Sequence, residues 1–174
     1  MKSDVIKIDN SGNGFQDALI QTTKSAQFRN LSHKETLQLR LCAEEMLSLA
    51  RSVTGEMQAS FWVESAGKQF DMHLSTKTVM EREKRENLLA SATSRKNEAA
   101  TTFLGKLRDA FEQAMLSDVT YSIPEDALDD LANHPIEIPE WDEYEQSILR
   151  KVADEVKIAI RGDMVDMTIT KKYA

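Results

Sequence analysis

Apolar residues recur at helical spacing over residues 32–53, and this pattern predicts the longest helix of the chain. Ser32 begins the segment and Glu35 follows three residues later, the spacing of a capping box, in which both side chains bond backbone donors. Glu45 lies at the border of the apolar arc, one turn before Leu49. At about 100° per residue, one broad arc holds Leu39, Cys42, Ala43, Met46, Leu47, Leu49, Ala50 and Val53. We therefore expect a central core helix with one carboxylate at the edge of its buried face.

Elsewhere the apolar and polar positions alternate, which indicates strands. Residues 5–8 form one short candidate strand. Residues 57–64 and 69–76 alternate on either side of a short turn, as do residues 155–161 and 164–171. Because four apolar faces must be buried together, we expect both hairpins to pair within one sheet.

Three further segments have helical patterns, and two connecting segments do not. The helical segments are residues 15–28, 81–90 and 103–116, and residues 144–153 can form another helix. Residues 91–102 are polar and are expected to be mobile; residues 117–145 hold all three prolines and are expected to be irregular, with Trp141 as an anchor. The element order predicts an α+β fold, a two-layer sandwich with helices on one face of a mixed, mostly antiparallel sheet. We expect residues 1–174 to form a single domain.

Composition narrows the class of protein. The chain has 174 residues, 41% hydrophobic and 29% charged, which is typical of a soluble globular domain. The net charge of -7 argues against a nucleic-acid partner, because neutralising phosphates requires clustered Lys and Arg. We expect no membrane partner, since no apolar run approaches the ~20 residues of a membrane span and the N-terminus lacks a signal-peptide core. Cys42 is the single cysteine, which excludes a disulfide within one chain, and we expect a cytoplasmic location.

Two stretches carry a resemblance to a known family. They are residues 41–50, Leu-Cys-Ala-Glu-Glu-Met-Leu-Ser-Leu-Ala, and the C-terminal residues 154–171, with Asp-Glu-Val at their start and Gly162 in their turn. Together with the element order, they resemble the GHKL ATPase superfamily in its anti-sigma-factor kinase branch. The resemblance covers residues 5–78 and 144–172. It implies a histidine-kinase-like ATPase fold, with a lid-like or helical insertion at about residues 79–143.

The resemblance also implies site residues, and several of them depart from the family pattern. Glu45 falls where the family has its catalytic general base, but Leu49 occupies the place of the Asn that binds Mg²⁺. A leucine offers no oxygen to a cation that requires oxygen ligands. Thr76 and Thr78 fall at the places of the Asp and Gly of the adenine-binding Asp-x-Gly motif. A threonine there can bond an adenine only as a neutral partner.

The glycines that follow the family's lid have two candidate counterparts. One is the pair Glu143 and Glu145, whose carboxylates would repel phosphates. The other is Gly105 with Lys106, one glycine and one cation at the start of a helix. The residues leave both alternatives open.

Each candidate residue also has an ordinary structural explanation. Glu45 can be a carboxylate at a helix border, without a catalytic role. Arg95, Lys96 and Lys106 can be a solvated basic surface as well as a phosphate-touching lid. Asp71 and His73 share the outward face of one strand, but a third ligand is missing from the pattern, so we expect no metal site.

Two functions follow from these observations. The first is a non-enzymatic, pseudokinase-like signalling domain with a degenerate nucleotide site. It would bind another protein, as anti-sigma-factor regulators of transcription bind a sigma factor or its antagonist. The second is an active ATP-binding serine/threonine protein kinase. We favour the first and expect no cofactor; ATP with Mg²⁺ is what the resemblance would imply. Whether the protein forms a homodimer stays open.

Overall fold

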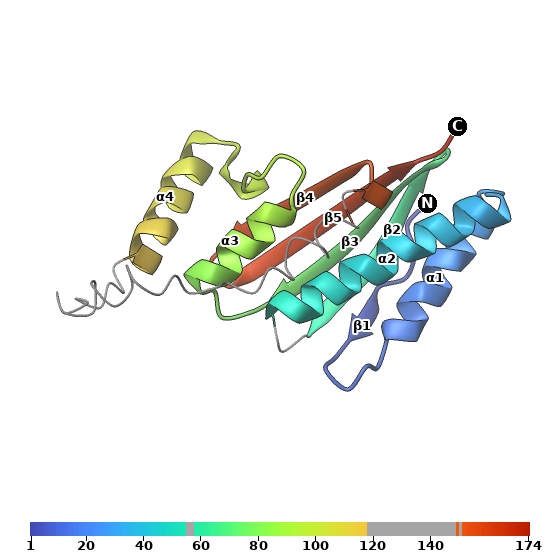
Figure 1. Ribbon diagram of the computed structural model, residues 1–174, viewed down its shortest axis with the longest axis horizontal. Coiled ribbons are helices and arrows are strands. Elements are labelled where there is room, and N and C mark those ends of the chain that lie inside the picture. The colour runs from blue at the N-terminus through green and yellow to red at the C-terminus, as the bar shows by residue number, and fades with distance from the viewer. Residues whose placement is uncertain (55–57, 118–148, 150) are drawn as a thin grey trace, which may run out of the picture.

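The computed structural model of the protein describes residues 1–54, 58–117, 149 and 151–174 (Figure 1). Five strands form one sheet in the order β1-β2-β3-β5-β4, and all four neighbouring pairs are antiparallel. The strands are β1 Ile6–Ile8, β2 Ala59–Ala66, β3 Gln69–Lys77, β4 Glu155–Arg161 and β5 Met164–Lys172. The two predicted hairpins therefore pair within one sheet, β3 against β5. Within the described chain, the expected parallel component is limited to an isolated bridge between Asn97 and Ile158.

The helices form a row on one side of the sheet. They are α1 Phe15–Phe28, α2 His33–Thr54, α3 Arg82–Ser91 and α4 Phe103–Ser117, with a short 3₁₀ turn, η1, at Glu98–Ala100. Figure 1 shows α1, α2 and α3 across one face of the sheet and α4 beyond α3, far from both chain ends. This arrangement confirms the predicted two-layer α+β sandwich. Among the described residues, no helix combines the length and apolar composition needed to cross a membrane.

Local chemistry sets the starts of α1 and α2. The capping box is present, because Ser32 N donates to Glu35 Oε2 at 2.7 Å and Glu35 N donates to Ser32 Oγ at 3.3 Å. Gly14 precedes α1 with a φ of 80°, and a Cβ there would lie 2.0 Å from the Lys7 carbonyl oxygen. Only glycine fits this close approach between the end of β1 and the start of α1.

The core lies between α2 and the inward face of the sheet. All the described side chains of the predicted α2 arc are buried, and Met46 and Leu47 have no exposed surface. Alternate residues of each strand face them, as the period-two patterns predict. These strand residues are Ala59, Phe61, Val63, Phe70, Met72, Leu74, Val156, Ile158, Ile160, Val165, Met167 and Ile169.

The connection between α3 and α4 is ordered where the sequence predicted a mobile segment, so that prediction was wrong. The Asn97 side chain accepts from Ile160 N at 2.8 Å and donates to Ile160 O at 2.9 Å. Thr93 bonds Val156 in both directions: its backbone N donates to Val156 O, and its Oγ1 accepts from Val156 N, each at 2.8 Å. The connection therefore covers β4, the edge strand, whose unpaired backbone groups would otherwise invite pairing with another chain. The side chains of Asn97 and Thr93, with the backbone N–H of Thr93, supply partners that a neighbouring strand would have given.

Predictions for residues 117–145, including the irregular structure and the Trp141 anchor, lie outside the described residues, except for Ser117 at the end of α4. Most of the helix expected over residues 144–153 also lies outside the described residues. Leu149 is described, helical and buried, and its carbonyl accepts from Ala153 N at 2.9 Å. The helical assignment therefore holds at the end that leads into β4.

Leu47→Ala should lower the free energy of unfolding by about 2–5 kcal/mol, because it removes a fully buried side chain and leaves a cavity. Urea unfolding provides the measurement. Leu37→Ala is the matched control, since Leu37 is on the same helix but 51% exposed, and it should cost less than about 1 kcal/mol. Equal losses for the two variants would contradict the placement of α2 in the core.

Candidate functional site

The two residues that the resemblance places at the catalytic centre differ in their surroundings. Glu45 is half-buried on α2. Leu49, one turn later, is 7% exposed and belongs to the hydrophobic core. The position that the resemblance assigns to a magnesium ligand thus holds an apolar side chain of the core. A metal ion next to Glu45 would have no oxygen ligand from this position.

Thr76 and Thr78 are buried and bonded within the fold. Thr76 is 1% exposed, and its hydroxyl donates to Gln58 O at 3.1 Å. Thr78 N donates to Asp163 O at 2.8 Å, and Lys84 Nζ donates to Thr78 Oγ1 at 3.2 Å. Both threonines therefore hold the end of β3 in place, and a bound base would have to compete with these contacts.

Gly105 and Lys106 lie in the first turn of α4. Thr102 caps this helix, because its Oγ1 accepts from Gly105 N at 3.0 Å and its carbonyl accepts from Lys106 N at 2.8 Å. A Cβ on Gly105 would lie 2.4 Å from Ala99 O. The glycine therefore permits close packing of α4 against η1, and two of the backbone donors near this helix start are already used.

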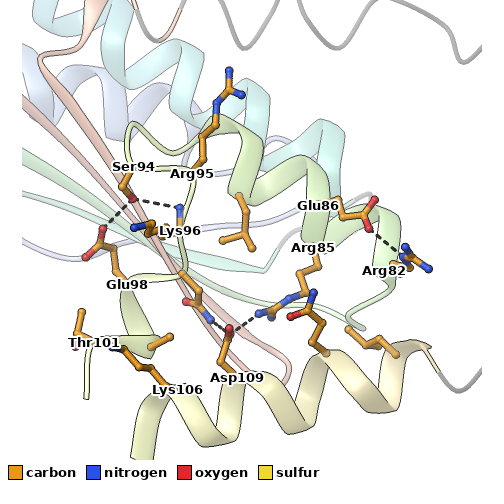
Figure 2. Close-up of a pocket in the computed structure, with 15 residues that line it drawn as sticks. Arg82, Arg85, Glu86, Ser94, Arg95, Lys96, Glu98, Thr101, Lys106 and Asp109 are labelled. Atoms are coloured by element: carbon orange, nitrogen blue, oxygen red, sulfur yellow. Dashed lines mark hydrogen bonds and ion pairs between the residues drawn. The ribbon is translucent and has the colours of Figure 1, made fainter. Parts of the chain in front are cut away.

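A pocket of about 610 Å³ lies between α3, the segment that follows it and α4; we call it the basic pocket (Figure 2). Among the described residues, five cationic side chains line it, against three carboxylates, so this part of the lining has a formal charge of +2 in a chain of net charge -7. The cations are Arg82, Arg85, Arg95, Lys96 and Lys106, and the carboxylates are Glu86, Glu98 and Asp109. Leu89, Ala100 and Leu116 add apolar surface. Of the sequence-predicted site residues, the pocket collects Arg95, Lys96 and Lys106, but not Glu45, Thr76, Thr78 or Gly105.

Arg85 is the most buried cation of the basic pocket. It is 5% exposed and forms an ion pair with Asp109, which Figure 2 shows reaching from α4 toward α3. Asp109 also accepts from Asn97 Nδ2, so the three residues tie α3, the connection and α4 together. Arg85 Nη1 is buried and has no hydrogen-bond partner among the described residues. A buried donor without an acceptor is costly, and it creates a demand for an anion or polar group.

Three cations of the pocket form no ion pair with a described residue. Within the described chain, Arg95, Lys96 and Lys106 form no ion pair, whereas Arg82 pairs with Glu86 at 2.9 Å. Arg95 has a φ of 54°, a left-handed conformation that costs a residue with a Cβ about 1–2 kcal/mol. In Figure 2 its side chain points away from α4, so it lies at the rim.

Sequence reasoning missed Arg82, Arg85, Asn97 and Asp109 as members of this site. The signal for Arg85 was present, because it lies three residues before the buried Leu88 and therefore on the inward face of α3. An arginine at such a position requires a buried partner. Asn97 gave no comparable signal, since its bonds are to β4, over 60 residues later in the chain.

The Asp71 and His73 pair lies on the outward face of β3, as predicted. Asp71 Oδ1 accepts from Thr170 Oγ1 at 2.6 Å, and His73 Nδ1 lies 3.1 Å from Thr168 Oγ1. The His73 ring stacks on Trp62, with centroids 4.9 Å apart and an angle of 12° between the rings. No group of three potential metal ligands occurs among the described residues. Both side chains thus contact β5 through hydrogen-bonding groups, and the His73 ring also stacks on a residue of β2.

Neither a protein-family model nor a curated protein matches this sequence. The likeness to the GHKL ATPases therefore rests on the residues named above and on the order of the elements. The site has to be argued from its own geometry and charge.

The unfolding free energy should depend on the titration of His73 as the pH falls through about 6.5, the ordinary pKa of histidine. Burial lowers the pKa of His73 below its ordinary value of 6.5, although Glu64 and Asp71 oppose the shift. The unfolded chain therefore binds the proton at a higher pH than the folded one, and stability falls as the pH drops through 6.5. His73→Gln, which does not titrate, should reduce this slope in urea unfolding.

His33→Gln makes the same chemical change at an exposed position and is the control. An unchanged slope in His73→Gln, or an equal reduction in both variants, would refute the role of His73. The acidic residues with lowered pKa values, such as Asp9 and Glu64, lose their contribution at lower pH and do not distinguish these variants.

Proposed function

We propose that this protein is a non-enzymatic regulatory domain of GHKL-like fold that acts by binding another protein through α4. The observation that carries the proposal is an exposed apolar stripe on this helix. Leu104 is 74% exposed, Leu107 59%, Phe111 64% and Met115 60%. Four large apolar side chains in one row indicate an interaction surface. We name these four residues the α4 stripe.

The α4 helix has its polar face toward the protein and its apolar face outward. At about 100° per residue, the α4 stripe spans about 80°, and Lys106, Asp109 and Gln113 lie on the opposite side. Those three residues line the basic pocket. A surface helix normally buries its apolar face, so the reversed orientation of α4 needs a reason outside the core. A protein partner that covers the α4 stripe would explain why this apolar face is turned outward.

The geometry of the stripe favours a partner with an apolar groove. The spacings of three, four and four residues are those by which a helix inserts one face into a groove. Arg108 and Glu112, which border the stripe on one side, pair with each other at 2.7 Å. Neither charge would be left uncompensated when the apolar row is covered.

The absence of enzymatic activity is part of the proposal and has separate support. The core position of Leu49 and the internal hydrogen bond of Thr76 leave Glu45 without the metal ligand and adenine partner of an active kinase. The cytoplasmic location is also proposed here. It agrees with the single cysteine, Cys42, which is a buried free thiol whose pKa is raised by burial to about 12.

ATP with Mg²⁺ should raise the melting temperature no more than GTP with Mg²⁺, and omitting Mg²⁺ should not reduce the effect. Any triphosphate can be attracted to a basic pocket, so only the difference between bases reports an adenine site. A true site would add about 2.7 kcal/mol at ligand concentrations 100 times Kd. Thermal unfolding with both nucleotides is the measurement. A rise in melting temperature that is specific to ATP, requires Mg²⁺ and is weakened by Glu45→Gln would contradict this proposal and favour an active kinase.

A photo-cross-linking residue at position 111 should capture one protein partner in the cells that make this chain, whereas the same residue at position 20 should not. Ile20 is the matched control, because it is 48% exposed on α1. The complex should re-form from the two purified proteins. Phe111→Glu should weaken it at least about tenfold, while changing the unfolding free energy by no more than about 0.5 kcal/mol.

Other outcomes would overturn the partner proposal. Cross-links only between copies of this chain, together with self-association that Phe111→Glu abolishes, would make the α4 stripe a dimer interface. A captured protein whose purified complex tolerates Phe111→Glu would place its binding site elsewhere. The absence of any cross-link at position 111 would also refute the proposal.

A further inference from the structure

We propose that the basic pocket binds a small molecule that carries a phosphate or diphosphate group, with Arg85, Lys96 and Lys106 as the anion-binding residues. This site is separate from the α4 stripe, which lies on the opposite face of the same helix, and does not depend on it. It also uses none of Glu45, Thr76 and Thr78.

The charge of the pocket argues for an anionic ligand. The described residues of the lining have a formal charge of +2 although the whole chain has -7, so cations are concentrated here against the overall charge. Lys96 and Lys106 form no ion pair within the described residues, and they reach the pocket from two different segments, the connection after α3 and the first turn of α4. The described cations of the pocket outnumber its carboxylates by five to three, and a bound anion would compensate the excess positive charge.

The buried guanidinium of Arg85 gives an independent argument for an anionic ligand. Arg85 is held by Asp109 through one of its nitrogens, and its Nη1 has no acceptor among the described residues. A phosphate oxygen would supply that acceptor, and the rigid fork of a guanidinium suits phosphate geometry. Because the Asp109 pair positions the side chain beforehand, little conformational freedom would be lost on binding.

The remaining lining limits the class of ligand. A volume of about 610 Å³ is in the range of sites for small molecules, and it exceeds what an inorganic ion needs. Leu89, Ala100 and Leu116 offer apolar contacts to a part of the ligand beyond its phosphate. The hydroxyls of Ser94 and Thr101 also line the pocket and can donate to further oxygens.

Titration calorimetry of the whole chain with pyrophosphate, and separately with inorganic phosphate, tests the proposal. We expect pyrophosphate to bind more tightly than phosphate, and acetate to show no binding. Lys96→Gln and Lys106→Gln should each raise the Kd for pyrophosphate by about tenfold, the value of one charge-assisted contact. In amide NMR spectra, pyrophosphate should shift signals of residues 94–98 and 105–109.

Lys24→Gln is the matched control, since it makes the same change in net charge at an exposed position of α1. It should leave the Kd within about twofold, because exposed charges beyond the screening length contribute little. An equal loss in all three lysine variants would show a general charge effect and overturn the proposal. Three other results would also overturn the proposal: pyrophosphate binding that is unchanged in Lys96→Gln and Lys106→Gln, equal binding of acetate, or no binding of any anion. Because both test lysines avoid the buried Arg85–Asp109 pair, misfolding would not obscure the result.

Discussion

The burial of the apolar arc of α2 against the inward face of the sheet is the contact on which the rest of the structure depends. Met46 and Leu47 of this helix and Phe61, Met72 and Ile158 of three strands belong to one buried cluster. The other helices are placed relative to this layer, with α1 and α3 on either side of α2 (Figure 1). The hydrophobic effect that drives this burial also explains why Leu49 cannot serve as a polar site residue. The burial of Leu49 is therefore both a part of the core and a support for the proposal that the nucleotide site is degenerate.

A second network, made of polar side chains, holds the elements together at the other end of the molecule. Asn97 satisfies Ile160 of the edge strand, Asp109 accepts from Asn97, and Arg85 pairs with Asp109. One chain of contacts thus joins β4, the connection, α4 and α3. Such a network is costly unless every member is satisfied. Here one nitrogen of Arg85 has no partner among the described residues, and Arg85 is one of the residues that line the basic pocket.

The two faces of α4 have different tasks in the proposed mechanism. The inward face carries Lys106 and Asp109 to the basic pocket, and the outward face carries the α4 stripe. Because a helix is rigid, a ligand that draws the pocket walls together would also move the stripe relative to the sheet.

The sequence by itself determined the elements whose signals are local. The Ser32–Glu35 capping box, the arc of α2 and the alternation of the two hairpins each depend on residues a few positions apart, and each appears as predicted. The joining of the hairpins into one sheet followed from the need to bury their apolar faces. Only the tertiary structure decided the order of residues 92–102, the partners of Arg85 and the gathering of five cations around one pocket. These features depend on side chains that meet across tens of residues of chain, where periodicity and spacing carry no information about which groups come into contact.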